Sequence, residues 1–303
     1  MDLATAIAQH RAQVRANGRS QHTLEQYCRH LQTLARWLAA SARDTGDVAD
    51  IDHLALADFL ASPEALLRAD GRAKMATSVN ALRNSLRGFF GYLHRAGVLA
   101  EDPSRLLARA RVGEAPPEGL VDADQERLLQ ALAAERSPAG LRDHALFRLL
   151  LSTGVRLGSA LALEVGDVDL DGGEALLRRC KGGQVQRVFF PECTSASLRL
   201  HLGPRTTGPV FPGQAGAPMT ARHAQRRLDH WLDKAGCRPC SPHRLRHAFA
   251  MGLYARTRDV LLVQRALGHR SIASTLRYAR ATDDELRAAV QGDPGVGLTL
   301  AVR

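Results

Sequence analysis

Several side chains in the C-terminal half of this 303-residue chain have the types needed to hold and attack a phosphodiester. Thr153-Gly154-Val155-Arg156 is followed by His243, by Arg246 three residues later, by Leu267-Gly268-His269, and by Tyr278 nine residues after that histidine. A phosphoryl group in transfer spreads negative charge over its oxygens, which bidentate guanidinium groups stabilise well. Histidine can donate a hydrogen bond or carry a proton near neutral pH. A phenol has a pKa of about 10, so it becomes a nucleophile only where cations or a base draw off its proton.

The local sequence around His243 predicts where two of these side chains point. Ser241-Pro242 is typical of a helix start, with serine as the N-cap and proline at the first helical position. His243 and Arg246 then share one face near the positive end of a helix, where a phosphate binds favourably. Taken alone, His-x-x-Arg is more typical of a solvated helix face. Its combination with the other motifs favours a phosphate site.

Lys181 is a candidate proton donor. Only Lys74, Lys181 and Lys234 are lysines among 41 basic residues, so arginine is the usual cation of this chain. Residues 176–190 predict two short strands around Gly182-Gly183, a hairpin that can extend Lys181 into a cleft. A lysine whose pKa is lowered by neighbouring cations can protonate a leaving 5′ oxygen, which arginine cannot. The alternative is an ordinary surface lysine at a hairpin tip.

Together these motifs resemble the tyrosine recombinase (phage integrase) family, and its compact Xer-like members most of all. Residues from about 119 to 290 resemble the catalytic domain, and six residues match its catalytic positions: Arg156, Lys181, His243, Arg246, His269 and Tyr278. Residues 5 to 108 are similar to the family's helical core-binding domain. The resemblance implies a mainly α fold with a small β-sheet, in which a SAM-like helical N-terminal domain precedes an α+β catalytic domain.

Two positions depart from the family pattern. Xer-type members typically have an acidic residue three positions after the first catalytic arginine, where this chain has Ser159. The hairpin usually reads Gly-Lys-Gly with an arginine five residues after the lysine; here Cys180 precedes Lys181, and Arg187 follows six residues after it. Neither change removes one of the six matched side chains.

The resemblance implies a site-specific DNA recombinase that works through a 3′-phosphotyrosine link without a metal or nucleotide cofactor. Its partners would be a double-stranded DNA site and three further protomers, as a homotetramer or as a heterotetramer with a paralogous recombinase. Resolution of DNA dimers and integration or excision of a mobile element are both open. A type IB topoisomerase and a catalytically idle DNA-binding regulator are the alternative functions.

Cysteine and histidine also occur with some of the spacing of a zinc site, in Cys237-x-x-Cys240-x-x-His243-x-x-x-His247. The usual motif leaves a dozen or more residues between its two pairs so that the chain can loop back, but here only two separate them. We therefore expect no metal here.

Composition agrees with a nucleic-acid partner. The net charge is +10, divided as +4 over residues 1–112 and +6 over residues 113–303, and a basic balance in both halves favours DNA. The sequence shows no export signal and no apolar stretch of membrane-spanning length, and its five cysteines do not indicate a disulfide framework. We expect a cytoplasmic, nucleoid-associated protein with no membrane partner.

Apolar residues recur at helical spacing in two N-terminal segments, along 24–38 (Leu24, Tyr27, Leu31, Leu34, Leu38) and along 79–93 (Val79, Leu82, Leu86, Phe89, Leu93), and predict core-facing helices. The other face of the second helix carries a stripe of Asn80, Arg83, Asn84 and Arg87. Asparagine can pair with adenine and arginine with guanine in a major groove, so this stripe is the candidate reader of DNA sequence. The alternative is a solvated face.

Proline and glycine in residues 109–119 predict an interdomain linker. The predicted organisation is a DNA-binding domain at 1–108, this linker, a catalytic domain at 120–290 and a tail at 291–303. In the catalytic domain, helices are expected from 122 and 140 and near 220–235, 243–257, 259–267 and 272–279. The tail alternates apolar and small residues with the period of a strand, and in this family such segments commonly pack on a neighbouring protomer; a frayed end is the alternative.

Overall fold

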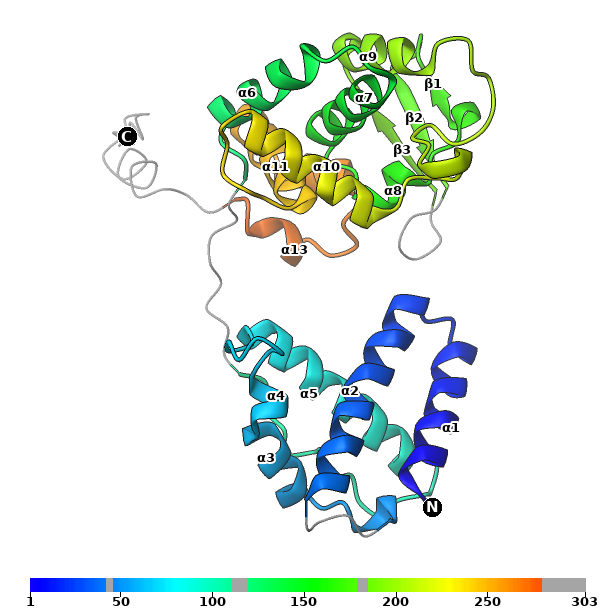
Figure 1. The fold of residues 1–303 in the computed structure, drawn as a ribbon, viewed down its shortest axis with the longest axis vertical. Coiled ribbons are helices and arrows are strands. Elements are labelled where there is room, and N and C mark those ends of the chain that lie inside the picture. The colour runs from blue at the N-terminus through cyan, green and yellow to red at the C-terminus, as the bar shows by residue number, and fades with distance from the viewer. Residues whose placement is uncertain (42–45, 111–118, 179–184, 280–303) are drawn as a thin grey trace, which may run out of the picture. The chain divides into compact units, whose positions relative to one another are not determined.

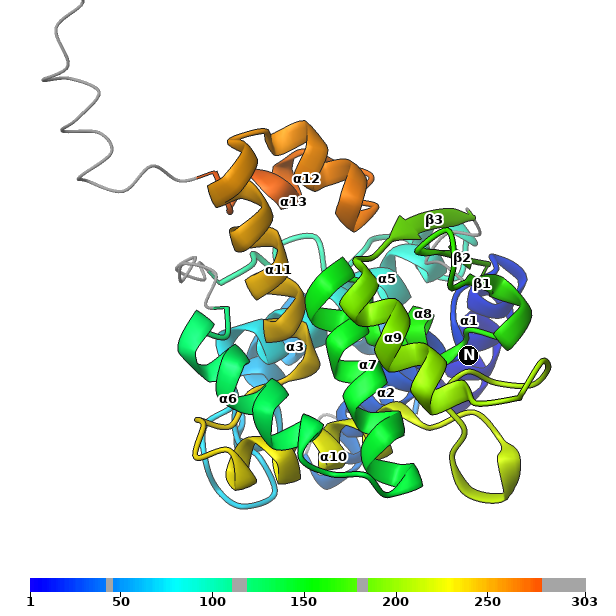
Figure 2. The same cartoon turned by 90° about the horizontal axis from the view of Figure 1, so that it is seen from above.

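The structure is a computed structural model that describes residues 1–41, 46–110, 119–178 and 185–279. It divides into two compact units, Met1–Glu114 and Ala115–Arg303. Figures 1 and 2 show helices in both units and one small sheet in the second, which confirms the predicted fold class. Within the described ranges, no helix combines the length and the apolar character needed to cross a membrane.

The first unit is a helical bundle. Its elements are α1 (Leu3–Ala16), α2 (Gln21–Ala40), the 3₁₀ helix η1 (Val48–Asp50), α3 (His53–Ala61), α4 (Pro63–Leu66) and α5 (Ala76–Arg95). The two predicted apolar stripes are its core, since the leucines of α2 and the apolar residues of α5 are buried. Tyr27 differs from this prediction, because it is only partly buried and its ring lies edge-on to that of His10.

His10 is a buried titratable group in this core. Its ring contacts Tyr27, Phe89 and Tyr92, with centroid distances of 5.3 to 5.4 Å. Burial among apolar atoms disfavours the charged imidazolium and lowers the pKa of His10 to about 4. The first unit therefore holds a neutral histidine in its core at physiological pH.

In the second unit the helices pack around α7. Its elements are α6 (Asp122–Ala133), α7 (Pro138–Thr153), α8 (Leu157–Leu161), η2 (Val165–Asp167), β1 (Val168–Asp169), β2 (Glu174–Leu177), β3 (Gln186–Phe189), α9 (Glu192–Leu202), η3 (Gln214–Gly216), α10 (Ala221–Lys234), α11 (Pro242–Thr257), α12 (Val260–Leu267) and α13 (Ala273–Leu276). Helices α6, α9 and α11 contact α7, which lies at the centre of this unit in Figure 1.

The small sheet confirms the two strands predicted within residues 176–190. The strand order is β1-β2-β3, and both pairs are antiparallel. In the longer pair Glu174 lies opposite Phe189 and Leu177 opposite Gln186. Lys181 belongs to the segment between β2 and β3 and lies outside the described residues.

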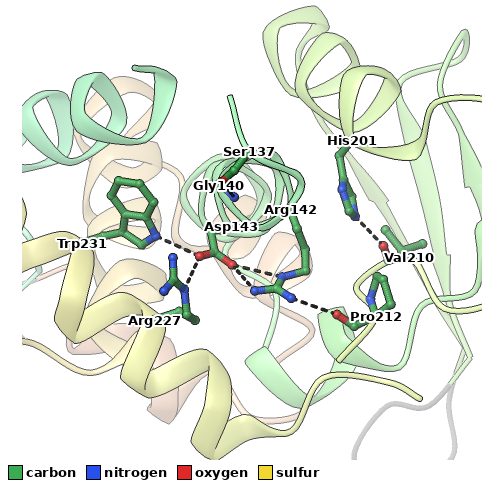
Figure 3. Close-up of polar contacts among 9 residues, drawn as sticks. All are labelled: Ser137, Gly140, Arg142, Asp143, His201, Val210, Pro212, Arg227 and Trp231. Atoms are coloured by element: carbon green, nitrogen blue, oxygen red, sulfur yellow. Dashed lines mark hydrogen bonds and ion pairs between the residues drawn. The ribbon is translucent and has the colours of Figure 1, made fainter. Parts of the chain in front are cut away.

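A buried carboxylate fixes α10 against α7 (Figure 3). Asp143 is fully buried in α7, and its Oδ2 accepts hydrogen bonds from Nε of Arg227 and, at 2.9 Å, from Nε1 of Trp231. Its Oδ1 accepts bonds from Arg142, whose Nη1 also donates to the carbonyl of Pro212 at 3.2 Å. Because an unpaired buried carboxylate is strongly disfavoured, this network holds α7, α10 and the loop before η3 in one arrangement.

Helix α11 begins at Pro242 with Ser241 as its N-cap, as predicted. Figure 2 shows it extending from the layer around α7 toward α12 and α13. Gly119 lies against the middle of this helix: a Cβ atom on Gly119 would lie only 2.9 Å from Cα of Ala248. A residue with a side chain could not make this approach without moving the helix.

Candidate active site

Arg246 joins three of the sequence motifs. It lies on α11 with 3% of its surface exposed, and its Nη1 donates to the carbonyl of Gly154 at 2.6 Å. Its Nη2 donates to the carbonyl of Leu267 at 2.8 Å. A guanidinium group has five N–H donors, so donors are left for an anion after these two bonds. Burial first, and the charge of Arg156 second, lower the pKa of Arg246 to about 10.

The turn at Gly154 leads the chain from the end of α7 to Arg156. It ends α7 in the left-handed conformation, with φ 62°, and an added Cβ would lie 2.3 Å from Cδ1 of Phe249. Only glycine fits this turn. Arg156 follows two residues later as the half-buried N-cap of α8, and its charge lowers the pKa values of Arg246, His243 and His269. The two predicted arginines therefore act on the same group of side chains.

Burial and the neighbouring cations lower the pKa values of both predicted histidines. Burial and then Arg246 lower the pKa of His269 to about 4, and its Nδ1 lies 2.8 Å from Oγ1 of Thr275. Gly268 ends α12 in the left-handed conformation and directs the chain into His269. His243 is exposed at the start of α11, and desolvation and then Arg246 lower its pKa. Neutral imidazoles can donate one hydrogen bond and accept another.

Tyr278 lies just after α13, in a turn rather than in the longer helix expected at 272–279. Its backbone N–H donates to the carbonyl of Thr275 at 2.9 Å, and its ring packs with Ala250, Val263 and Leu267. Only 7% of its surface is exposed. Burial raises the pKa of its phenol, while Arg277 and Arg246 act in the opposite direction. The structure thus gathers five of the six predicted residues, namely Arg156, His243, Arg246, His269 and Tyr278.

His247 is a member of the site that the motifs did not indicate. Its Nδ1 lies 2.6 Å from Oη of Tyr278, and its ring lies 4.4 Å from that of His243 in an edge-on contact. The sequence raised this histidine only as a zinc ligand. Cys237 and Cys240 of the same pattern are buried in the core of the second unit. The signal that could have found His247 is its place one residue after Arg246 and four after His243, next to both on α11.

Ser159 stands where the resemblance to Xer-type members implies an acidic residue. It lies in the short helix α8, it is buried, and its backbone N–H donates to the carbonyl of Arg156 at 2.9 Å. A buried carboxylate at this position would need partners for its charge.

The predicted DNA-reading stripe on α5 is partly occupied by the chain itself. Asn80 makes two 2.9 Å bonds with the backbone of Ala110, donating from Nδ2 and accepting at Oδ1. Arg83 also donates to Oδ1 of Asn80, and Arg109 donates twice to Oδ1 of Asn84. Arg87 is exposed, and Arg83 is partly buried. The side-chain amides of Asn80 and Asn84, which were predicted to pair with adenine, therefore bind residues 109 and 110 in this structure.

Known protein families match both units. Residues 120–285 match the phage integrase family, and residues 10–97 match the phage integrase N-terminal SAM-like domain. The chain belongs to the phage integrase family. This membership confirms the resemblance to the tyrosine recombinases.

The relatives are Xer recombinases. The chain is 31% identical over 280 residues to tyrosine recombinase XerD of Ralstonia nicotianae, covering 89% of this chain and 87% of that protein. It is 30% identical over 273 residues to tyrosine recombinase XerC of Pelobacter propionicus, covering 88% and 87%. The protein is therefore a DNA strand-transferring enzyme of the site-specific recombinases.

Solved structures share the fold of this recombinase at lower identity. XerH site-specific recombinase, in a pre-cleavage complex with its difH substrate, has a TM-score of 0.68 at 23% identity and covers 88% of this chain and 79% of that one. The Tn1549 transposon integrase, in complex with a circular intermediate DNA, has a TM-score of 0.73 at 18% identity, with coverage of 96% and 99%.

Proposed function

We propose that this recombinase cleaves and rejoins one strand of a double-stranded DNA site through Tyr278. Oη of Tyr278 attacks the scissile phosphorus, the 5′ oxygen leaves, and a 3′-phosphotyrosine link forms. Because the link conserves the energy of the phosphodiester, a 5′ hydroxyl of a second duplex reverses the step without a metal or nucleotide. The observation that supports this proposal best is the pair of hydrogen bonds from the guanidinium of Arg246 to the carbonyls of Gly154 and Leu267, which join three of the sequence motifs.

Each remaining predicted residue has a role set by its chemistry. Arg156 and Arg246 bind the non-bridging oxygens, where negative charge grows in the transition state. His243 and His269 donate hydrogen bonds to the same group. Lys181 protonates the departing 5′ oxygen.

The partner is a DNA recombination site on which four protomers bring two duplexes together, as a homotetramer or with a paralogous recombinase. The comparison structures support DNA as the partner, since XerH was solved with difH substrate and lambda integrase as a dimer on a core site. The first unit is the core-binding DNA-binding domain, with Arg83 and Arg87 of α5 among its DNA contacts. The protein acts in the cytoplasm on the nucleoid.

Trapping on nicked suicide duplexes tests this function. Duplexes tiled across the genomic neighbourhood of the gene are incubated with the full chain, and covalent adducts are resolved on a denaturing gel. We expect an adduct on a small set of duplexes, and none with Tyr278→Phe, which keeps the ring and loses the nucleophile.

Three outcomes would contradict the proposal. An adduct that persists in Tyr278→Phe would show another nucleophile. Relaxation of supercoiled plasmid of any sequence would indicate a type IB topoisomerase. DNA binding without any adduct would indicate an idle regulator.

A further inference from the structure

The phenol of Tyr278 already has a proton acceptor. Oη lies 2.6 Å from Nδ1 of His247, within the range in which proton transfer between heteroatoms is direct. Both residues have 7% of their surface exposed. Because both are withdrawn from solvent, bulk water competes poorly for the phenolic proton.

The two histidines of the family motif are less well placed for this task. Nδ1 of His269 lies 2.8 Å from the hydroxyl of Thr275, on the chain segment that precedes Tyr278. His243 is exposed, and its ring contacts that of His247. Among the three histidines, His247 is the one bonded to the nucleophilic oxygen.

His247 is neutral in the free protein and therefore able to accept a proton. Burial, and then the cations around it, lower its pKa to about 4. These charged and titratable neighbours are His243, Arg244 and Arg246 on α11, and Arg277 beside Tyr278 after α13. With Nδ1 facing the phenol, the matching tautomer carries its proton on Nε2, so that the hydroxyl donates and Nδ1 accepts.

We propose that Nδ1 of His247 takes the phenolic proton as Tyr278 attacks the scissile phosphate, an inference that rests on the proposed role of Tyr278 as the nucleophile. In this step the Oη–H bond breaks and the Oη–P bond forms. The P–O5′ bond breaks, and the 5′ oxygen takes a proton from the general acid assigned above to Lys181. In rejoining, a 5′ hydroxyl attacks the phosphotyrosine and gives its proton back to Lys181 as the P–O5′ bond forms, the Oη–P bond breaks, and His247 returns its proton to Oη.

Substrate itself makes His247 a competent base. The cations that hold His247 neutral include Arg246, which lies among the anion-binding groups of the site. A bound phosphate brings negative charge to these cations and stabilises an imidazolium nearby. The free enzyme thus keeps its tyrosine protonated and buried, and deprotonation is favoured only when a phosphodiester is in place.

His247→Asn separates proton transfer from positioning. An asparagine amide takes the place of Nδ1 and can bond to the phenol, but it cannot accept a proton at neutral pH. His230→Asn, which changes an exposed histidine on α10, is the matched control. On the duplex identified by trapping, we expect single-turnover adduct formation to fall roughly 10²- to 10⁴-fold in His247→Asn and to stay at the wild-type rate in His230→Asn.

A fluorinated tyrosine at position 278 gives an independent readout. Fluorine lowers the pKa of a phenol, so less help from a base is needed, and the gap between His247→Asn and the wild type should narrow. The rate of His247→Asn should also rise with pH more steeply than that of the wild type. The inference would be overturned if His247→Asn formed the adduct within threefold of the wild-type rate with an unchanged pH profile. It would also be overturned if the difference in rate between His247→Asn and the wild type stayed the same after fluorination.

Proton transfer can also be measured without a variant. In the full chain with ¹⁵N-labelled histidine, we expect His247 to carry one ring proton when free and two when orthovanadate and the cleaved duplex occupy the site. A His247 that stays neutral in that complex would refute the proposal. Failure of the wild type to form any adduct, or an adduct in Tyr278→Phe, would instead contradict the proposed function.

Discussion

Arg246 is expected to matter far more for cleavage than for stability, and Arg246→Met tests this. A pKa near 10 in place of the usual 12.5 means that folding disfavours the charged guanidinium by roughly 3 kcal/mol. The variant removes this penalty, but it leaves the carbonyls of Gly154 and Leu267 without a donor, at about 1–3 kcal/mol each. The opposing terms leave a net loss of stability of about 3 kcal/mol at most. Since about 2–4 °C corresponds to 1 kcal/mol in a unit of this size, the Tm should fall by less than about 12 °C.

The rate of DNA cleavage should fall much more than stability in Arg246→Met. Loss of one preorganised group that stabilises transition-state charge typically lowers the rate 10²-fold or more, and we expect at least this for adduct formation by Arg246→Met. Inorganic phosphate gives a binding readout without DNA. The bonds from Arg246 to Gly154 and Leu267 go to neutral carbonyls, so a bound anion should pair with its charge and raise the Tm of the wild type more than that of the variant.

Arg199→Met is the matched control. Arg199 is an exposed guanidinium on α9 that pairs with Asp171 and Glu192. Its loss removes the same charge, and both adduct formation and the response to phosphate should be unchanged. Cleavage by Arg246→Met within tenfold of the wild-type rate would refute the role assigned to Arg246. So would an equal gain in stability from phosphate, or a loss in Tm far above about 12 °C.

Three further predictions follow from individual residues. Lys181→Arg should slow cleavage of a normal 5′-oxygen substrate but not of a 5′-bridging phosphorothiolate, whose leaving group needs no proton; equal rates on the normal substrate would exclude the general-acid role. Because the pKa values of His10 and His247 are lowered from 6.5 to about 4, the unfolded chain binds protons in this window that the folded chain does not. The contribution of each histidine to the free energy of unfolding should be fully present above pH 6.5 and should fall by roughly 3 kcal/mol as the pH is lowered toward 4. A Tm that does not change over this pH range would contradict both pKa shifts. Arg87→Ala should weaken DNA binding: discrimination should fall by about 1–3 kcal/mol at one base pair if Arg87 reads a base, and affinity should fall equally for all sequences if it binds phosphate. Unchanged DNA affinity in this variant would remove Arg87 from the interface. Asn80→Ala, in contrast, should mainly lower the Tm of the first unit.

Local signals predicted much of the fold. Ser241 and Pro242 predicted the start of α11, because serine suits the N-cap and proline the first helical position. The spacing of apolar residues along α2 and α5 predicted the core of the first unit, because the helical period decides which side of each helix faces inward.

Contacts between distant segments could not be predicted in this way. Asn80 bonds to the backbone of Ala110, 30 residues later, and His247 bonds to Tyr278, 31 residues later. A stripe of polar residues has the same period whether its amides face DNA or the protein's own backbone. The position of His247 on α11 likewise does not reveal its partner. The bond to Tyr278 forms only because the turn after α13 brings the phenol to this face of α11.

The contact between Gly119 and Ala248 has a mechanical consequence. At Gly119 the backbone comes so close to α11 that an added Cβ would lie 2.9 Å from Cα of Ala248, one residue after His247 and two after Arg246. A displacement of the backbone at Gly119 is therefore delivered to the helix that carries both side chains. A side chain at position 119 would thus move the helix that aims His247 and Arg246.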